Sequence, residues 1–466
     1  MVKLIRLVYI ITITILAIVE LIFWKGYPSI LLIFAVLIQL TLVMYLTPKR
    51  FHFLNPIFIL FITTNLSVLA RAYYMVYSNS TDVKSFLLFG HSYDTFVIGA
   101  LWIVLSFIPF IVGYSYAEKN LSQSTNYLSI NWNVKRLWFS VICLVILAFI
   151  GVYFFLTEIG IDNTEAIMGD VSKKRYKNLD DSKYASSMGY LRLLASLSEI
   201  ATYLIIVYRL SSRRKLGPLG ISLLILAFMT SSFFAFFVSS RTALITFALN
   251  IAIILYAYRK LSLKLIVTGS ISIILVFSLM TKLREEKSGK ESTLAKSVEK
   301  IIVNRNLLGI SRTGIVLNET PKELPFQYGK SLFLWLVSPI PRAVWKNKPA
   351  ISIAKDIGSN VFKMESRSGV PPGIIAENFI NFGYLGFLLM YPFGYIFGII
   401  FQKHRINRNF VEPDKLLIYL ILAVNLSTLF FGGTLSQTIV GTLQVLIPTI
   451  IISKFVLRKY PVFTVT

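Results

Sequence analysis

The amino-acid sequence predicts an all-α, polytopic membrane protein with about 12 transmembrane helices and a large extracytoplasmic loop domain. Three observations predict this fold class. Of the 466 residues, 55% are hydrophobic and only 15% are charged, and the mean hydropathy is +0.70. The apolar runs approach 20 residues, the length that a helix needs to cross the hydrocarbon core. Lysine and arginine gather in alternate loops, as they do on the cytoplasmic side of membrane proteins.

The first predicted span lies in the segment MVKLIRLVYIITITILAIVELIFW. Two early cations precede an apolar stretch that is longer than a signal-peptide core, and no small-residue cleavage site follows. We therefore expect an uncleaved helix. The hydropathy pattern predicts spans that begin near Leu4, Pro28, Phe53, Asp94, Lys135, Met188, Gly217, Thr242, Leu261, Glu377, Lys415 and Leu435.

The positive charges then assign a side to each loop. If the N-terminus is cytoplasmic, the cytoplasmic loops receive Lys49, Arg50, Lys119, Lys135, Arg136, Arg209, Arg213, Arg214, Lys215, Arg259, Lys260, Lys264, Lys403, Arg405, Arg408, Lys415, Lys454, Arg458 and Lys459. The short loops on the other side hold little beyond Lys25, Lys84 and Arg241. Because the alternation holds at every turn, we expect both termini on the cytoplasmic side.

This topology divides the chain into three parts. Residues 1–281 contain nine spans and an outer loop at 158–187, residues 282–375 form a cap outside the membrane, and residues 376–466 contain the last three spans. The cap carries sixteen Lys or Arg against eight acidic residues. The orientation rule does not explain this excess, because long translocated loops are exempt from it. Apolar residues at helical spacing over 294–308 predict a helix that lies in the interface.

Three arginines lie close to the outer ends of predicted spans: Arg71 in SVLARAYYMV, Arg192 in GYLRLLASLSE and Arg241 in FFVSSRTALITF. Charge inside a bilayer is costly, so such residues either serve a function or extend their heads to the lipid phosphates. Arg241 is placed in a very short turn among small residues, which favours a function for it. Together with the basic cap, these arginines predict a cationic chamber for a phosphate or diphosphate headgroup. The headgroup could belong to a substrate lipid or to a structural anionic lipid, and both interpretations stay open.

The segment SPIPRAVWKNKP, residues 338–349, places Arg342, Trp345 and Lys348 three residues apart. A short tight turn would put all three on one side. A planar cation, a flat aromatic ring and a point cation could together hold an anionic sugar derivative. An amphipathic loop on lipid headgroups, with Trp345 as its anchor, explains the same residues. Both interpretations stay open at this point.

A carboxylate that could act as a reaction group is a further candidate, because SGVPPGIIAENFINFGYLG ends the cap and opens the next span. A rigid Pro-Pro-Gly turn precedes Glu377, and Asn378 and Asn381 follow at spacings that place them near it on a helix. The helix dipole favours a carboxylate at this position even without a catalytic task, so both interpretations remain. Gly383 and Gly386 fit close packing better than ligand binding.

Other chemistries fit the sequence poorly. The three histidines are far apart, so no metal site is predicted. No phosphate-binding glycine loop and no nucleophile elbow occurs, and we expect no cofactor. The single cysteine, Cys143, excludes an internal disulfide. The net charge of +25 is scattered through short loops, so nucleic-acid binding is not expected.

The order of SRT in a short outer turn, FQYGKSLF and PIPRAVWKNKP in a large outer loop, and PPGIIAENFINFGYLG at a span resembles the Wzy-type O-antigen and capsular polysaccharide polymerases. These are bacterial oligosaccharide repeat-unit polymerases. The specific motifs run from about Arg241 to Gly386, and the hydropathy profile covers the rest. The chain departs from the pattern at Ala376, where glycine would be expected.

The resemblance implies a glycosyltransferase in the cytoplasmic (inner) membrane with an active site that faces outward. It would transfer a glycan from one undecaprenyl diphosphate to another lipid-linked repeat unit, with a chain-length co-polymerase and membrane lipids as further partners. Arg241 and Arg342, with Arg312, would neutralise the departing diphosphate, and Glu377 would be the general base. Trp345 would stack on a sugar. Substrate binding would further involve Lys348, Arg71, Arg192, Asn378 and Asn381.

Other functions compete with this one. A flippase for lipid-linked oligosaccharides would also contain many spans and a cationic interior, although it needs no large outer cap. A ligase of the O-antigen type would differ only in its acceptor. A non-catalytic membrane scaffold would leave the arginines and the residues around Glu377 unexplained.

Overall fold

The structure is a computed structural model that describes residues 2–77, 92–121, 132–158, 182–237, 241–286, 309–340, 344–363 and 369–458. The first helices are α1 (Val2–Ile22), α2 (Tyr27–Tyr45), α3 (Pro56–Thr64), η1 (Asn65–Leu69), α4 (Ala70–Tyr77), α6 (Tyr93–Asn120), α7 (Val134–Glu158), α9 (Ser182–Ser212), α10 (Pro218–Phe237), α11 (Arg241–Ala257) and α12 (Leu263–Glu286). The later ones are α14 (Gly309–Glu319), α15 (Lys330–Phe333), η5 (Leu334–Val337), α16 (Ala354–Asp356), η6 (Ile357–Val361), α17 (Ile374–Phe382), η7 (Gly383–Leu389), α18 (Met390–Lys403), α19 (Pro413–Gly432), α20 (Leu435–Ile450) and η8 (Ile451–Val456).

The helical membrane architecture is confirmed. Within the described residues, ten helices are long and apolar enough to cross a membrane. Two shorter apolar helices, Ala243–Ala257 and Leu263–Val276, accompany them. No strand occurs among the described residues beyond two isolated bridges. The total of about 12 spans stays a prediction, and the helix expected over 294–308 lies outside the described residues.

Prolines explain where several helices begin. α3 and α19 start at Pro56 and Pro413, a few residues away from the predicted starts. Proline at the first helical position is favourable because its missing N–H would have no partner there. Asn55 caps α3 by accepting a hydrogen bond from the Ile57 N–H at 2.9 Å.

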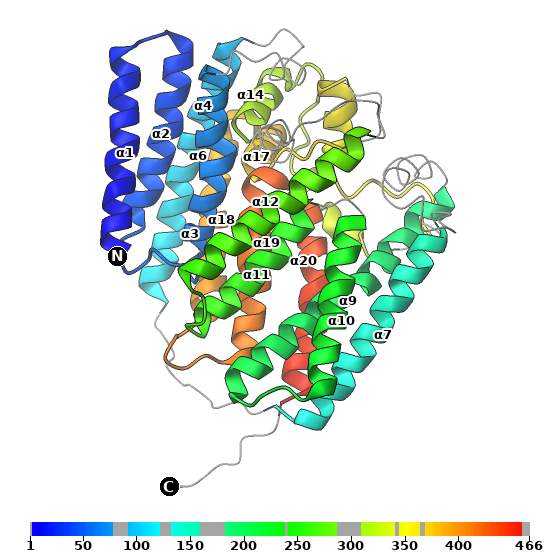
Figure 1. Cartoon of the computed structure of the whole chain (residues 1–466). Helices are drawn as coiled ribbons and strands as arrows, with labels where there is room; N and C mark the ends of the chain where they lie inside the picture. The colour runs from blue at the N-terminus through cyan, green and yellow to red at the C-terminus, as the bar shows by residue number, and fades with distance from the viewer. Residues whose placement is uncertain are drawn as a thin grey trace.

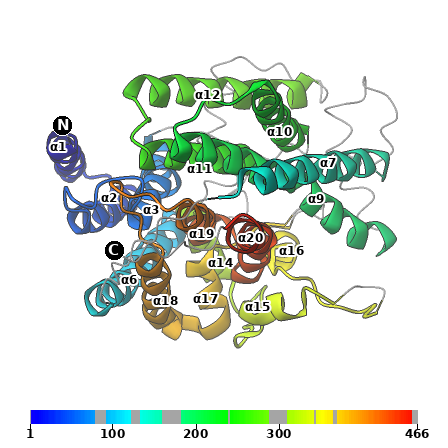
Figure 2. The same ribbon diagram turned by 90° about the horizontal axis from the view of Figure 1, so that it is seen from below.

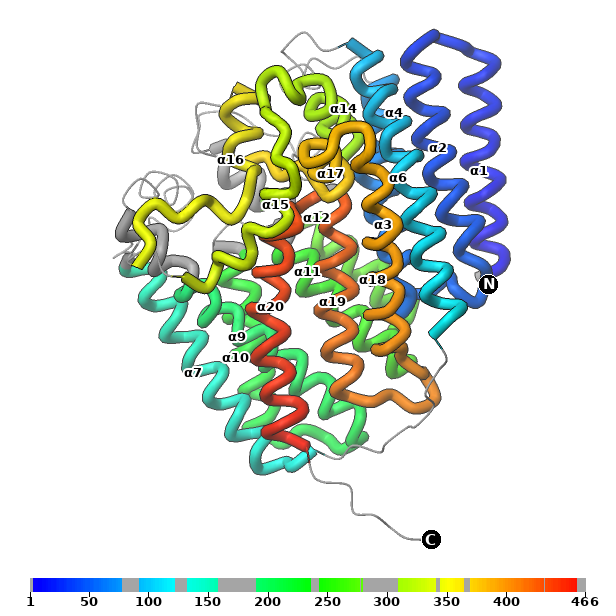
Figure 3. The backbone as a smooth tube through the Cα atoms, turned by 180° about the vertical axis from the view of Figure 1, so that it is seen from behind, coloured from blue at the N-terminus to red at the C-terminus, as the bar shows by residue number. Residues whose placement is uncertain are grey.

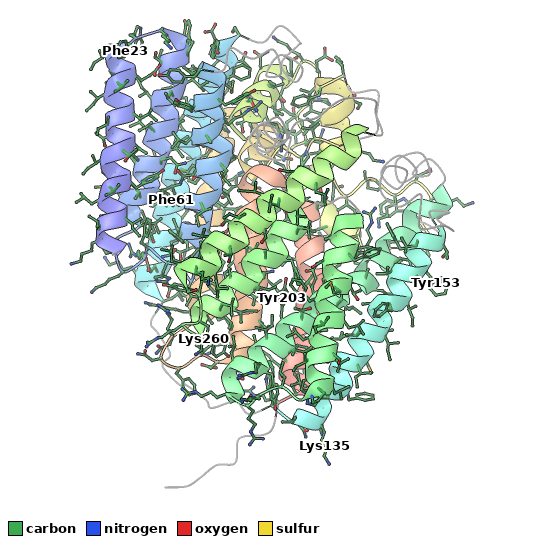
Figure 4. All side chains as sticks on the ribbon, in the orientation of Figure 1. Phe23, Phe61, Lys135, Tyr153, Tyr203 and Lys260 are labelled. Carbon is green, nitrogen blue, oxygen red and sulfur yellow. The ribbon has the colours of Figure 1, made fainter. Side chains whose placement is uncertain are left out.

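The helices form a bundle with most of the described cap residues at one end. α1, α2 and α4 stand at one edge, α7, α9 and α10 at the other, and α19 and α20 lie between them (Figure 1). α14, α16 and α17 lie together at one end, above α18, α19 and α20 (Figure 3). Lys135 lies at the opposite end (Figure 4). We call these the α14 end and the Lys135 end.

A buried carboxylate joins the first two helices to α4. Glu20 of α1 accepts hydrogen bonds from Ser29 of α2 at 2.7 Å and from the Tyr77 hydroxyl of α4. The glutamate is 0% exposed. A buried carboxylate is costly unless it is hydrogen-bonded, and here both oxygens are. This contact fixes the α14 end of α4, the helix that carries Arg71.

α6 is held against α18 by glycines at which the two backbones touch. A Cβ on Gly394 would lie 2.0 Å from the Phe110 carbonyl oxygen, and one on Gly113 would lie 2.2 Å from the Tyr391 carbonyl oxygen. Gly398, one turn after Gly394, faces Ala117 in the same seam. Small residues four apart allow helix backbones in membranes to approach closely. Figure 2 shows α6 and α18 side by side in the bundle.

The seam predicts a strong effect of one added methyl group. We expect Gly394→Ala to destabilise the protein by about 1–3 kcal/mol, because its Cβ would overlap backbone rather than a movable side chain. Gly441→Ala is the matched control: a Cβ added to this helical glycine of α20 would meet nothing within 4 Å, so alanine should be neutral or slightly stabilising. Thermal unfolding in detergent measures both. Equal midpoints for the two variants would contradict the seam.

Candidate functional site

Arg71 lies at the start of α4, directly after the π-helical turn η1. Its side chain is 0% exposed, and none of its three guanidinium nitrogens has a hydrogen-bond partner among the residues that the structure describes. The Tyr74 ring lies 5.8 Å from the guanidinium carbon. π-helical turns are uncommon and occur often at functional sites. A buried guanidinium with five donors and no acceptor is a place for an anion.

Arg312, on α14, is the second buried guanidinium at this position. It is 1% exposed and donates a hydrogen bond to the carbonyl of Pro371. Burial lowers the pKa of Arg312 to about 10, and the positive charge of Arg71 contributes to the decrease. The two cations are therefore close enough to repel one another. The structure brings these two predicted binding residues together.

Glycines allow α14 to pack closely against α6, and this packing brings Arg312 near Arg71. A Cβ on Gly314 would lie 2.2 Å from the Thr95 carbonyl oxygen, and one on Gly99 would lie 2.5 Å from the Gly314 nitrogen. α14 thus meets the first turns of α6 with almost no gap. It also packs against η1 and α17. Every residue from Gly309 to Leu317 is buried.

Glu377 lies on α17 and is also fully buried, at 0% exposure. One carboxylate oxygen accepts a hydrogen bond from the Ser331 hydroxyl at 2.9 Å, and the other accepts one from the Leu435 N–H at 2.7 Å. Leu435 is the first residue of α20. The carboxylate therefore caps the N-terminus of a second helix, where the helix dipole favours negative charge.

The turn before α17 links Glu377 to the arginines. Gly373 has φ of +80°, a conformation that glycine adopts at little cost, and its carbonyl accepts the Glu377 N–H at 2.9 Å. Two residues earlier, the Pro371 carbonyl accepts the hydrogen bond from Arg312. One short turn thus contacts both the cationic pair and the helix of the carboxylate.

Asn381 completes the contacts around Glu377. Its amide donates to the Ser331 hydroxyl at 2.8 Å and to the Glu377 carbonyl at 2.7 Å, and its oxygen accepts the Gly329 N–H at 2.9 Å. Ser436, in the first turn of α20, donates to the Ser331 carbonyl at 2.7 Å. α17, the segment around Ser331 and α20 are therefore joined by side chains that are buried and hydrogen-bonded.

The Asn378 side chain points in a different direction from those of Glu377 and Asn381. It is 1% exposed, and its amide donates to the Met390 sulfur at 3.3 Å. A helix turns by about 100° per residue, so position 378 leaves the face that carries Glu377 and Asn381. The carbonyl of Asn378 lies against Gly386, where a Cβ would approach it to 2.3 Å. The packing role expected for Gly386 agrees with this contact.

The proline-rich segment is described only in part. Lys348 is buried, at 9% exposure, and its ammonium donates to the carbonyls of Ser338 and Ile340, both at 2.8 Å. Trp345 is 39% exposed. Arg342 lies outside the described residues. Lys348 therefore braces the backbone of this segment.

The structure describes the side chain of only one of the other predicted arginines. Arg192 of α9 is half-buried, with its guanidinium 5.6 Å from the centre of the Phe155 ring of α7. Arg241 begins α11, but its side chain lies outside the described residues. The structure therefore groups Arg71 with Arg312, and Glu377 with Asn381.

Ser331 and the start of α20 were missed by sequence reasoning. Ser331 lies in KSLF, where nothing in the local pattern predicts a contact with a glutamate far along the chain. The start of α20 carries a visible signal, since Thr434 is an N-cap residue that accepts the Gln437 N–H at 3.4 Å. Among the described residues, no group of three His, Cys, Asp or Glu could hold a metal ion.

Comparison of the chain with protein-family models, with curated proteins and with solved structures gives no match.

The buried charge of Arg71 predicts an unusual effect on stability. In anion-free buffer, Arg71→Met should raise the midpoint of thermal unfolding, because removing a buried charge that has no hydrogen-bond partner among the described residues relieves about 1–4 kcal/mol of desolvation cost. Arg50→Met is the contrasting variant, since Arg50 donates to Glu118 at 2.6 Å and should lower the midpoint when lost. A lower midpoint for Arg71→Met would mean that its surroundings already stabilise the charge.

The cap that Glu377 forms on α20 predicts local loosening when the charge is removed. A glutamine side chain could accept from only one of the two donors with its single oxygen, so Glu377→Gln should expose the first turn of α20. The loss of a charged hydrogen bond costs about 1.5–3 kcal/mol, or at least a ~10-fold rise in amide exchange. Hydrogen exchange over residues 433–440 measures this. Ser331→Ala keeps the Leu435 contact and should leave that exchange unchanged; equal rates in both variants would contradict the cap.

Proposed function

We propose that the protein is a glycosyltransferase that polymerises undecaprenyl-diphosphate-linked oligosaccharide repeat units at the outer face of the cytoplasmic membrane. In this proposal the chain has about 12 spans, both termini are cytoplasmic, and residues 282–375 form the extracytoplasmic cap. The observation that carries it is the pair Arg71 and Arg312, two buried guanidiniums at the α14 end of the bundle. The resemblance described for the sequence supplies the substrate class.

The cationic pair suits a diphosphate. Arg71 presents nitrogens that have no hydrogen-bond partner among the described residues, and Arg312 adds positive charge beside them. Guanidinium forks match phosphate oxygens in pairs. In a buried site these hydrogen bonds are far stronger than in water, and a bound anion would offset part of the desolvation cost of the cations.

The reaction in this proposal transfers a growing glycan. A hydroxyl oxygen of the acceptor repeat unit attacks the anomeric carbon of the donor glycan, and the bond from that carbon to the diphosphate oxygen breaks. Undecaprenyl diphosphate leaves with the bonding electrons, and the arginines stabilise the charge that develops on it. Arg241 and Arg342 are assigned to the same charge stabilisation because of the sequence resemblance.

The proton of the acceptor hydroxyl goes to Glu377 in this proposal. Each carboxylate oxygen accepts one hydrogen bond, so each retains a lone pair that can accept a proton. The buried hydrogen bonds that join α17, the segment around Ser331 and α20 would hold that carboxylate in one orientation. Trp345, which is partly exposed, would stack on a sugar ring, and Lys348 would shape the segment that carries it.

The proposal predicts a defined phenotype in cells that lack the native gene. Arg71→Ala and Arg241→Ala should each reduce polymerisation about 10²–10³-fold, as removal of a group that stabilises developing charge does. Surface glycan on a gel should then show single repeat units without a ladder. Lys135→Ala, which removes an exposed cation at the Lys135 end, should keep the ladder. A flippase defect would instead leave no surface repeat unit and trap the precursor inside, and full ladders from both arginine variants would overturn the proposal.

A further inference from the structure

Large apolar side chains cover the outside of the segment that contains α15 and η5. Phe333 is 61% exposed, Leu336 is 56% exposed and Val344 is 79% exposed. Such a group of exposed apolar residues is unusual on a surface that faces water. The opposite side of the same segment carries Ser331, which is 2% exposed and contacts Glu377.

The segment lies beside the spanning helices rather than beyond their ends. The Trp335 N–H donates to the Ser436 hydroxyl at 3.1 Å, and Ser436 is in the first turn of α20. The Gln327 N–H donates to the Ile380 carbonyl of α17 at 2.9 Å. α15 lies on the outside of α17 and α20 (Figures 2 and 3). The segment is therefore level with the first turns of two apolar, spanning helices.

Exposed residues of η7 continue this apolar surface. Tyr384 is 78% exposed and Leu385 is 69% exposed. The Phe379 ring lies 5.4 Å from the Tyr384 ring and 6.3 Å from the Phe326 ring, so aromatic packing connects η7 to the start of the segment. Tyr328, two residues after Phe326, is 81% exposed. Exposed tyrosines beside leucine and phenylalanine are typical of the boundary between headgroups and acyl chains.

Several backbone groups of the segment are hydrogen-bonded, which favours lipid contact. Backbone N–H groups of Leu332, Ser338 and Ile340 donate to carbonyls three residues earlier. The carbonyls of Ser338 and Ile340 in turn accept hydrogen bonds from the Lys348 ammonium. An irregular segment at membrane depth would otherwise leave polar groups unpaired at a cost of several kcal/mol each.

We propose that residues 328–340, Val344, Trp345 and η7 form a rim that is inserted into the phospholipid leaflet at the α14 end. The occupant of the apolar surface is phospholipid, with acyl chains against Phe333, Leu336 and Leu385. The surface is continuous with the outside of α20, where Leu443 and Ile447 are 37% and 50% exposed on a spanning helix. Since Ser331 and Phe333 are two residues apart on opposite sides, lipid contact positions the residue that holds Glu377.

The single cysteine makes the depth of this rim measurable. In a Cys143→Ser background, a nitroxide is attached in turn to Phe333→Cys, Leu336→Cys and Leu385→Cys, and the full-length protein is placed in phosphatidylcholine nanodiscs. Ile447→Cys provides the reference inside the lipid, and Lys322→Cys provides the exposed, charged reference. We expect the three rim labels to collide with oxygen more than with a water-soluble nickel chelate, as the Ile447 label does.

Two outcomes would overturn the proposal. Rim labels that match the Lys322 label, with preferential nickel collisions, would place the surface in water. Dipolar broadening between labels on different copies would show that a second copy covers it. An independent measurement uses the native tryptophans. Brominated phosphatidylcholine should remove a larger absolute amount of emission from the unlabelled protein than from Trp345→Phe. Equal quenching would place Trp345 away from lipid.

Discussion

A positive charge that is removed from water is the constraint around which this structure is arranged. Arg71 is completely buried, and no hydrogen-bond partner for it occurs among the described residues. Arg312 adds a second buried cation next to it. A buried charge is tolerated when a counter-charge pairs with it or when a function depends on it. A bound anion would therefore stabilise this site, and the surrounding helices have to hold the two cations in place without one.

That rigidity comes from backbone contact. Gly99 and Gly314 bring α14 against α6, and Gly113 and Gly394 bring α6 against α18. α6 is thus in backbone contact with α14 on one side and with α18 on the other, so α14 cannot move away from Arg71 without breaking its contact with α6. On the other side of α4, Glu20 holds Tyr77. Since lipid supplies no hydrophobic force between helices, close packing and buried hydrogen bonds of this kind are what keep two repelling cations together.

The sequence was informative where lipid imposes simple rules and less informative where distant residues meet. The spans could be predicted because each must be apolar over its whole length, and Arg71 could be singled out as a charge in an apolar run. The partners of Glu377 could not be predicted, because Ser331 lies far before α17 in the sequence and Leu435 lies far after it. Asn378 was grouped with Glu377 by spacing, yet its amide contacts Met390.

The proline-rich segment shows why two interpretations of one motif need not exclude each other. Lys348 was considered as a charge for substrate or for headgroups, and its ammonium donates to two carbonyls of its own loop. A loop braced in this way can present Phe333 outward while Ser331 holds Glu377 inward. This segment therefore has one face that is exposed and apolar and another that packs against the buried carboxylate. The same physical requirement, a satisfied backbone at membrane depth, then serves both lipid contact and the geometry of the buried carboxylate.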